Sequence, residues 1–143
     1  MAQLKVSHIS KAFDDQEILK DVTLELRDNE RVSLLGVSGG GKTTLFNVIS
    51  GLLKPEEGQV FLDGKDITGQ PGNVSYMLQK DLLLPYRTIE DNVALPLIIK
   101  GEKKKEARKK ACSYFLEFGL EGTEKKYPSQ LSGGMRQRAA LLR

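Results

Sequence analysis

A glycine-rich loop set between a strand and a helix is the feature that most constrains how this chain can fold. The pattern Gly36-x-x-x-x-Gly41-Lys42-Thr43 follows residues 32–35, an apolar run fit for a buried strand, and precedes residues 44–53, where apolar side chains recur at helical spacing. Glycines allow several backbone N–H groups to approach one phosphate chain, and the start of a helix favours an anion. Residue frequencies in this chain give roughly 0.014 chance matches to the pattern, so a glycine turn that binds nothing is a poor alternative.

Two side chains of this loop have distinct expected roles. Lys42 would bring a mobile positive charge to the β- and γ-phosphates of a nucleotide, and the Thr43 hydroxyl would bind Mg²⁺. The loop alone does not choose among kinases, GTPases and transport or motor ATPases.

The first part of the chain, residues 1–79, has the periodicity of strands. Leu4, Val6 and His8 alternate with their neighbours, and further strands are expected at residues 18–26, 59–62 and 74–78. The strand at residues 59–62 ends in Asp63-Gly64, which predicts a hairpin turn. His8 lies before the loop on the first strand, so we expect a structural role for it.

The second part, residues 80–143, has helical spacing. Helices are expected at residues 91–99, where Pro96 should break the helix, at residues 102–118, and from Leu131 to the last residue. The buried face of the second helix is expected to consist of Ala107, Ala111, Tyr114, Phe115 and Phe118. Cys112 on this helix is expected to pack inside the protein.

The opposite face of that helix is basic. It carries Lys103, Lys104, Lys105, Arg108, Lys109 and Lys110. Glu106 stands four residues before Lys110, a spacing that favours an ion pair on a helix. No aromatic residues interleave with the lysines to stack on bases, so a solvated face is favoured over a nucleic-acid or lipid surface.

Composition excludes several classes of protein. The chain has 143 residues, and 22 Lys+Arg against 19 Asp+Glu give a net charge of +3, too small for a dedicated polyanion binder. The longest apolar run, residues 93–99, contains Pro96 and is far shorter than the roughly 20 residues of a membrane span. The N-terminus has no apolar core of signal-peptide length and Cys112 is the single cysteine, so we expect a cytosolic protein.

A second glycine motif narrows the function. Residues 131–138 read LSGGMRQR, which places a possible Ser132 cap and two glycines at the start of a helix, a second anion-binding end. With this motif beside the loop, the chain resembles the ATP-binding cassette (ABC) family of ATPases. GVSGGGKTT, residues 36–44, is similar to that family's Walker A loop, and LSGGMRQR is similar to its signature motif.

The resemblance implies an α/β P-loop NTPase fold with an N-terminal antiparallel β subdomain and a helical subdomain. An ATP-binding core would occupy residues 1–79, and the helical subdomain, residues 80–143, would end in the signature helix. Gln79 would contact Mg²⁺ and the catalytic water and, with Lys42, serve catalysis. Phe13 would lie against adenine. The implied ATP contacts are Phe13, Gly36, Ser38, Gly39, Gly40, Gly41, Lys42, Thr43, Thr44, Ser132, Gly133 and Gly134, and the implied Mg²⁺ ligands are Thr43 and Gln79.

Residues 79–101 further resemble importer ATPases of the nitrate, sulfonate and taurine type, in which this region receives a helix of the transmembrane permease. The residues themselves show only that 82–86 form an apolar loop, which could equally pack internally or bind a partner. The family implies a head-to-tail dimer, peripheral on the inner face of the cell membrane, with no nucleic acid bound.

The resemblance also implies what lies outside these residues. The family's Walker B strand and switch histidine follow the signature helix, so we expect a chain truncated before Walker B. Without the water-polarising carboxylate it should not hydrolyse ATP alone. Loss of a strand from the central sheet should also favour self-association or a distorted phosphate loop. Two other functions stay open: a soluble ABC-type ATPase acting on ribosomes or DNA, and a nucleotide-binding module without catalysis.

Overall fold

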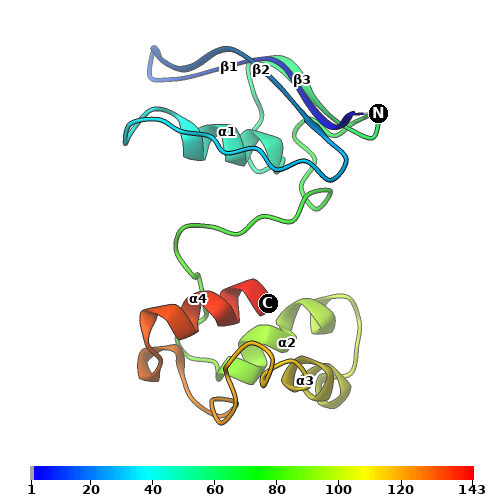
Figure 1. The fold of residues 1–143 in the computed structure, drawn as a ribbon, viewed down its shortest axis with the longest axis vertical. Coiled ribbons are helices and arrows are strands. Elements are labelled where there is room, and N and C mark those ends of the chain that lie inside the picture. Colours follow the sequence, from blue (N-terminus) through cyan, green and yellow to red (C-terminus); the bar gives the residue numbers. More distant parts are fainter. Residues whose placement is uncertain (1) are drawn as a thin grey trace. The chain divides into compact units, whose positions relative to one another are not determined.

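The computed structural model describes residues 2–143, with side chains from Leu4 onward, so residue 1 of the expected first domain lies outside the described residues. The chain forms two compact units (Figure 1). The first ends at Tyr76, and the second is Met77–Arg143.

The first unit is an antiparallel sheet packed against one helix. Its strands are β1 (Ala2–Phe13), β2 (Gln16–Arg27), β3 (Glu57–Leu62) and β4 (Lys65–Asp66), in the order β2-β1-β3-β4. The helix α1 is Lys42–Ile49. Side chains from the sheet, from α1 and from the residue after β4 form one core: Val6, Ile9, Leu19, Leu45, Val48, Ile49, Val60 and Ile67. The expected turn after β3 is confirmed, since Asp63 and Gly64 both have positive φ.

The expected strict alternation along β1 is wrong at His8. Val6 and Ile9 are both fully buried although they stand three residues apart, because the pairing of β1 with β2 shifts register between them. This bulge places His8 at φ 53° on the exposed side, where its Nδ1 contacts Asp21 Oδ1 at 2.5 Å. His8 is therefore an exposed residue that contacts the neighbouring strand β2 through Asp21, in line with the structural role expected for it.

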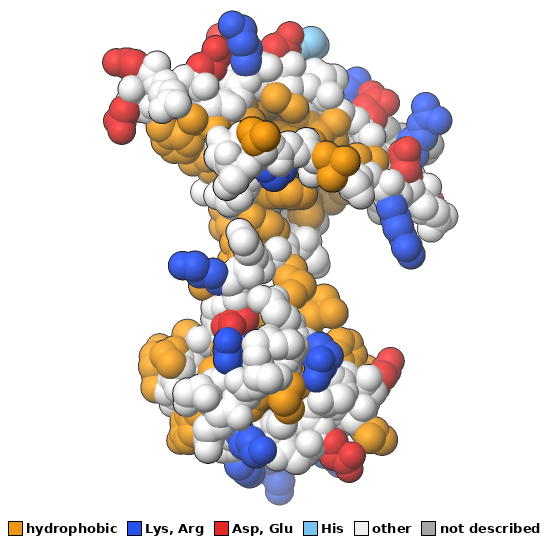
Figure 2. Space-filling view, turned by 60° about the vertical axis from the view of Figure 1, so that its left-hand side comes forward, with side chains coloured by type: hydrophobic (Ala, Val, Ile, Leu, Met, Phe, Trp, Pro, Cys, Tyr) orange, Lys and Arg blue, Asp and Glu red, His pale blue; other side chains and the backbone are white. Residues whose placement is uncertain are grey.

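Two of the strands expected within residues 1–79 are not formed. Residues 32–35 and 74–78 have no strand pairing among the described residues, and Leu35 is 90% exposed. A strand is stable only with a hydrogen-bonded neighbour, and every pairing in the described sheet is an antiparallel one that leaves these segments out. Val32, Leu34, Leu35 and Val37 are exposed. Figure 2 shows hydrophobic side chains on the surface of the first unit.

The second unit is helical. It contains α2 (Ile89–Ile99), α3 (Lys104–Cys112), the short 3-10 helix η1 (Pro128–Gln130) and α4 (Gly133–Leu142). Its core consists of Leu83, Ile89, Val93, Ala94, Ala107, Ala111, Phe115, Leu120, Leu131 and Ala139. Cys112 packs at the edge of this core, as expected. No helix among the described residues is long and apolar enough to cross a membrane.

The helix expectations need two corrections. Pro96 does not break α2, since the helix continues to Ile99 and the Pro96 carbonyl still accepts from the Lys100 N–H at 3.1 Å. Proline removes one donor, and the neighbouring bonds suffice to carry the helix past it. The expected helix at 102–118 ends at Cys112, and turns follow it; Tyr114, expected to be buried, is therefore 48% exposed, whereas Phe115 is buried.

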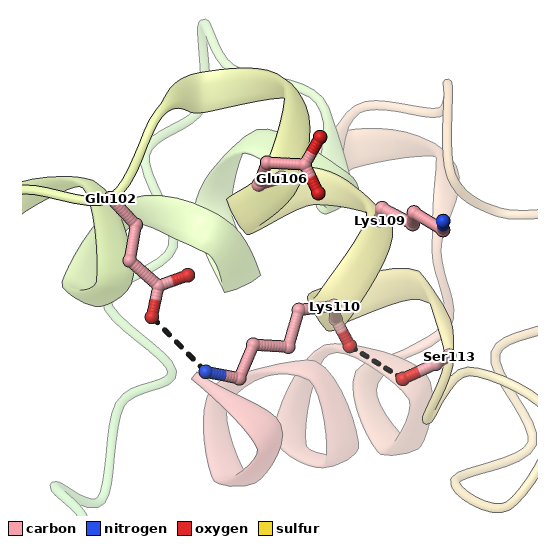
Figure 3. A pocket seen from close by; sticks show the side chains of 5 residues that line it. All are labelled: Glu102, Glu106, Lys109, Lys110 and Ser113. Atoms are coloured by element: carbon pink, nitrogen blue, oxygen red, sulfur yellow. Dashed lines mark hydrogen bonds and ion pairs between the residues drawn. The ribbon is translucent and has the colours of Figure 1, made fainter.

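The lysines of the basic face lie in solvent, as the charge pattern predicts, but Arg108 is half-buried and pairs with Asp91. The lysine side chains point outward from the second unit. The expected pair of Glu106 with Lys110 is not formed, because Lys110 Nζ instead contacts Glu102 Oε1 at 3.1 Å (Figure 3). The residues around this pair line a shallow depression: Glu102, Glu106, Lys109, Lys110 and Ser113.

Candidate functional site

The glycine loop ends at the start of α1, where backbone donors are free. Gly41 is the N-cap, and its carbonyl accepts the first helical bond from the Leu45 N–H at 2.9 Å. Within the described chain no group accepts a hydrogen bond from the N–H of Lys42, Thr43 or Thr44. Unpaired donors and the helix dipole together favour an anion at this position.

Gly41 is required at this point by both conformation and space. Its φ is 83°, and a Cβ built there would lie 2.9 Å from the Ile18 carbonyl oxygen and 3.0 Å from Leu19 Cδ2. Glycine therefore lets the loop lie directly against β2 before the helix begins.

Lys42 folds back over the loop. Its Nζ donates to the carbonyl oxygens of Gly36 and Val37, both at 2.7 Å, and the Gly40 N–H also bonds to the Val37 carbonyl at 3.1 Å. The ammonium group is thus held beside the loop that carries the free donors. Positive charge and unpaired N–H groups in one loop fit a phosphate chain.

The other residues of the first-unit site are accessible. Ser38, Gly39, Gly40 and Thr43 are exposed, and Thr44 is half-buried. The Thr43 hydroxyl is an oxygen donor of the kind that Mg²⁺ prefers. Phe13 ends β1 with 46% of its surface exposed, and Lys11 Nζ lies 5.4 Å from its ring centroid, a cation–π contact.

The LSGG motif forms a capped helix start in the second unit. Ser132 is the N-cap of α4, and its side chain accepts a hydrogen bond from the Met135 N–H at 3.3 Å. Gly133 and Gly134 open the helix and are exposed. Leu131 is buried in the core and fixes the direction in which the chain enters the helix.

Gln79 belongs to the second unit, with an exposed side chain. Its backbone carbonyl accepts from Gln137 Nε2 on α4 at 3.1 Å. In the first unit the structure thus brings the loop residues to the start of α1, and Phe13 lies at the end of β1 in the sheet of the same unit. In the second unit it brings Gln79 to α4, the helix that Ser132 caps.

Sequence reasoning missed the residue that shapes the apolar loop. Asn92 of α2 is fully buried, and its Oδ1 accepts from the Leu84 N–H at 2.7 Å. The two N–H groups of its Nδ2 are shared among the carbonyls of Leu84, Arg87 and Thr88, which lie at 3.1 to 3.2 Å. The loop is therefore held rigidly. Leu83 points into the core, whereas Tyr86 is 73% exposed, so this loop both packs internally and presents a surface.

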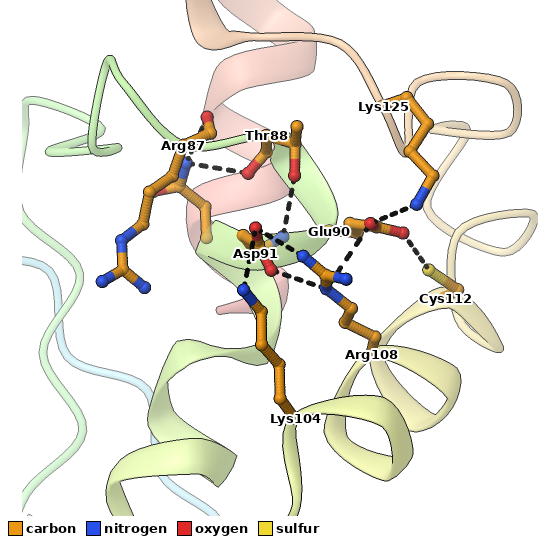
Figure 4. Close-up of polar contacts among 9 residues, drawn as sticks. Arg87, Thr88, Glu90, Asp91, Lys104, Arg108, Cys112 and Lys125 are labelled. Carbon is orange, nitrogen blue, oxygen red and sulfur yellow. Dashed lines mark hydrogen bonds and ion pairs between the residues drawn. The ribbon is translucent and has the colours of Figure 1, made fainter.

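A polar cluster beside this loop joins the helices of the second unit (Figure 4). Arg108 of α3 contacts both carboxylate oxygens of Asp91 at 2.7 and 2.8 Å, and Glu90 accepts from Lys125 Nζ at 2.5 Å. The hydrogen bonds from Arg108 hold the pKa of Asp91 below its ordinary value. Burial, with the nearby Glu90 carboxylate, raises the pKa of the Cys112 thiol. Only the fold brings these residues together, so the sequence carried no signal for them.

A phosphate-binding loop at a helix start and a second capped glycine helix define a P-loop nucleotide-binding fold of the ATP-binding cassette kind. Residues 19–143 match the family described as ABC transporter, and the chain belongs to that family.

Named relatives agree with this assignment. The formylaminopyrimidine import ATP-binding protein ThiZ of Halalkalibacterium halodurans is 45% identical over 141 residues, covering 98% of this chain and 54% of that protein. The taurine import ATP-binding protein TauB of Escherichia coli O157:H7 is 39% identical over 140 residues, covering 98% and 55%. The chain thus spans about half the length of the curated relatives it matches.

A solved structure shares the fold. The dimeric structure of a post-hydrolysis state of the ATP-binding cassette MJ0796, bound to ADP and Pi, has a TM-score of 0.82 and 32% sequence identity. The match covers 97% of this chain and 67% of that chain. The expected fold class and the resemblance to importer ATPases are confirmed.

Proposed function

We propose that this chain is the nucleotide-binding part of an ABC transporter ATPase, which couples ATP binding and hydrolysis to transport through a membrane permease. The observation that carries the proposal is the start of α1, where the Lys42 ammonium contacts the glycine loop and the N–H groups of Lys42, Thr43 and Thr44 have no acceptor among the described residues. The names of the relatives are those of import proteins, which does not favour the alternative of a soluble ATPase acting on ribosomes or DNA.

Nucleotide binding would use the groups already held in place. Lys42 would exchange its two carbonyl partners for the β- and γ-phosphates, and residues 36–44 would supply their backbone N–H groups. The exposed ring of Phe13 would stack on adenine. Thr43 and Gln79 would hold Mg²⁺, which would neutralise phosphate charge during transfer to water. The amide of Gln79 would also orient that water.

A second copy would complete the site. Ser132, Gly133 and Gly134 of one subunit would close over the γ-phosphate held by Lys42 of the other, giving a head-to-tail dimer. The capped start of α4 supports this role, since Ser132, Gly133 and Gly134 are exposed there.

The permease would dock on the second unit at residues 79–94, where the rigid apolar loop presents Leu82 and Tyr86. The assembled protein would lie at the inner face of the cell membrane, bound through the permease. Nucleic acid has no part in this function, given the small net charge of +3.

Substitution of Lys42 tests nucleotide binding. Lys42→Ala should weaken the affinity for ATP with Mg²⁺ by at least about tenfold in calorimetry, because a charge-assisted contact to phosphate is lost. Lys20→Ala is the matched control, since Lys20 lies on β2 with a side chain that is 82% exposed. Equal ATP affinity in Lys42→Ala and the unchanged protein would refute the proposal.

Substitution of Ser132 tests the dimer. Ser132→Arg in the full-length gene product should leave ATP binding to the subunit intact and abolish ATP-dependent dimerisation, measured by light scattering. An unchanged dimer with ATP would place Ser132 outside the interface.

A further inference from the structure

Side chains of α4, and of Arg143 directly after it, contact the segment that carries Gln79, defined here as residues 79–83 and called the Gln79 segment. Gln137 Nε2 donates to the Gln79 carbonyl at 3.1 Å, and Arg136 Nε donates to Asp81 Oδ2 at 3.1 Å. Arg143 donates to the carbonyls of Leu82 and Asp81 at 2.7 and 3.1 Å. Side chains of α4 thus form hydrogen bonds with a segment more than fifty residues earlier in the chain.

Arg136 joins two places at once. Its Nη1 donates to the Leu131 carbonyl at 2.8 Å, and Leu131 directly precedes the Ser132 cap. Its Nε holds one carboxylate oxygen of Asp81, whose other oxygen accepts from the Leu83 N–H at 3.1 Å. A single planar guanidinium therefore links the turn before Ser132 to the bend that follows Gln79.

The bend needs such support. Leu82 has a φ of 48°, a conformation that is unfavourable for a residue with a Cβ, and its side chain is half exposed. Backbone in this region persists only when the surrounding structure holds it. Arg136 of α4, and Arg143 directly after it, make the described polar contacts to Asp81 and Leu82 that hold this bend.

We propose that Arg136 is a positioning residue that, through Asp81, makes the Ser132 turn and the Gln79 segment move as one piece. The inference rests on the proposed function, in which Ser132 and Gln79 both act on bound nucleotide. A displacement of the Gln79 segment is transmitted to the start of α4 through the guanidinium, and closure at Ser132 is transmitted back to Gln79. Arg136 itself touches no nucleotide in this scheme.

Arg138 provides a matched control on the same helix. It also uses its Nε to bond a distant backbone carbonyl, that of Phe118 at 2.9 Å, but it has no contact with the Gln79 segment among the described residues. A general loss of helix anchoring would affect Arg136 and Arg138 variants alike, whereas positioning of Gln79 would affect Arg136 alone.

The test is steady-state ATP hydrolysis by the full-length gene product. Arg136→Gln should lower kcat by about tenfold while KM for ATP changes by less than about twofold, because a charge-assisted bond is lost away from the nucleotide. Arg138→Gln should leave kcat within about twofold. Hydrogen exchange should show faster exchange at the Leu83 amide in Arg136→Gln and not in Arg138→Gln.

A double substitution separates positioning from stability. Asp81→Asn should reproduce the loss of kcat, and Asp81→Asn with Arg136→Gln should be no worse than the more severe single variant, since both remove the same link. Arg136→Lys keeps the charge and should recover part of the rate. If Arg136→Gln does not fold, Asp81→Asn gives the same test.

The inference would be overturned if the losses of kcat in Asp81→Asn and Arg136→Gln were additive in the double variant, or if Arg136→Gln and Arg138→Gln lost kcat equally. In either case ATP binding would stay normal. Failure of the proposed function would look different, because Lys42→Ala would then retain full affinity for ATP.

Discussion

Gly41→Ala is the substitution whose effect follows most directly from the geometry of the loop. A Cβ at this position meets two obstacles. The backbone has a φ of 83°, and the new atom lies 2.9 Å from the Ile18 carbonyl oxygen, 3.0 Å from Leu19 Cδ2 and 3.1 Å from Ile18 Cγ2. The nearest of these atoms belongs to the backbone of β2, so it cannot rotate away.

Gly39→Ala separates the two obstacles. Gly39 has nearly the same φ, 80°, but nothing lies within 4 Å of a Cβ built there. The left-handed conformation costs about 1–2 kcal/mol for a residue with a Cβ at either position. Overpacking against β2 should add about 1–3 kcal/mol at Gly41 alone. We therefore expect Gly41→Ala to lower the free energy of unfolding by about 2–4 kcal/mol, and Gly39→Ala by about 1 kcal/mol after the smaller entropy of its unfolded chain is counted.

The assay is urea unfolding followed by far-UV circular dichroism, because the chain has no tryptophan to report by fluorescence. Both variants should shift the midpoint without changing the slope. Equal free energies of unfolding for Gly39→Ala and Gly41→Ala would show that the loop does not lie against β2 as described, and would refute the steric argument.

Three further outcomes follow from the second unit. Asn92→Ala should lower the free energy of unfolding by about 3 kcal/mol and speed hydrogen exchange at Leu84, since the hydrogen bonds of a fully buried side-chain amide are lost; unchanged exchange there would contradict the anchoring role. Because the pKa of Asp91 is lowered in the folded protein from its ordinary 3.8, its ionised form adds stability above that pH, and this stability is lost as the pH falls through the lowered value. Asp91→Asn should therefore flatten the pH dependence of unfolding in acid, and an unaltered acid transition would argue against the Arg108 pair. Cys112, with its raised pKa, should react with iodoacetamide at pH 8 at least about tenfold more slowly than in urea, and equal rates would show that the thiol is not shielded.

The sequence predicted the local elements of the site well. The hairpin turn at Asp63 and the Ser132 cap are found where the pattern placed them. The helix after the glycine loop is formed as well, but it is α1 at Lys42–Ile49 and not the expected 44–53. Each depends on residues within about four positions of one another, through a positive φ or a side chain bonding the nearest free N–H. The roles assigned to Gln79, Phe13 and the loop residues toward nucleotide stay predictions.

The failures have a common cause, which is dependence on distant neighbours. An apolar run at 32–35 can only suggest a strand, and the strand does not form because no described segment pairs with it. The alternation along β1 was wrong at His8 since the register shift comes from pairing with β2. Local spacing also predicted a break at Pro96 that the helix does not have, and it predicted a helix through Tyr114 where the helix ends at Cys112.

The sequence by itself determined the phosphate loop, the LSGG helix start and, with them, the family, because these depend on short patterns of glycine, lysine and serine. Only the tertiary structure decided which side chains support them. Arg136 meets Asp81 across 55 positions, Asn92 shapes a loop that precedes its own helix, and Gly41 touches β2. Such contacts depend on how two elements pack, and neither residue carries a local signal of its distant partner.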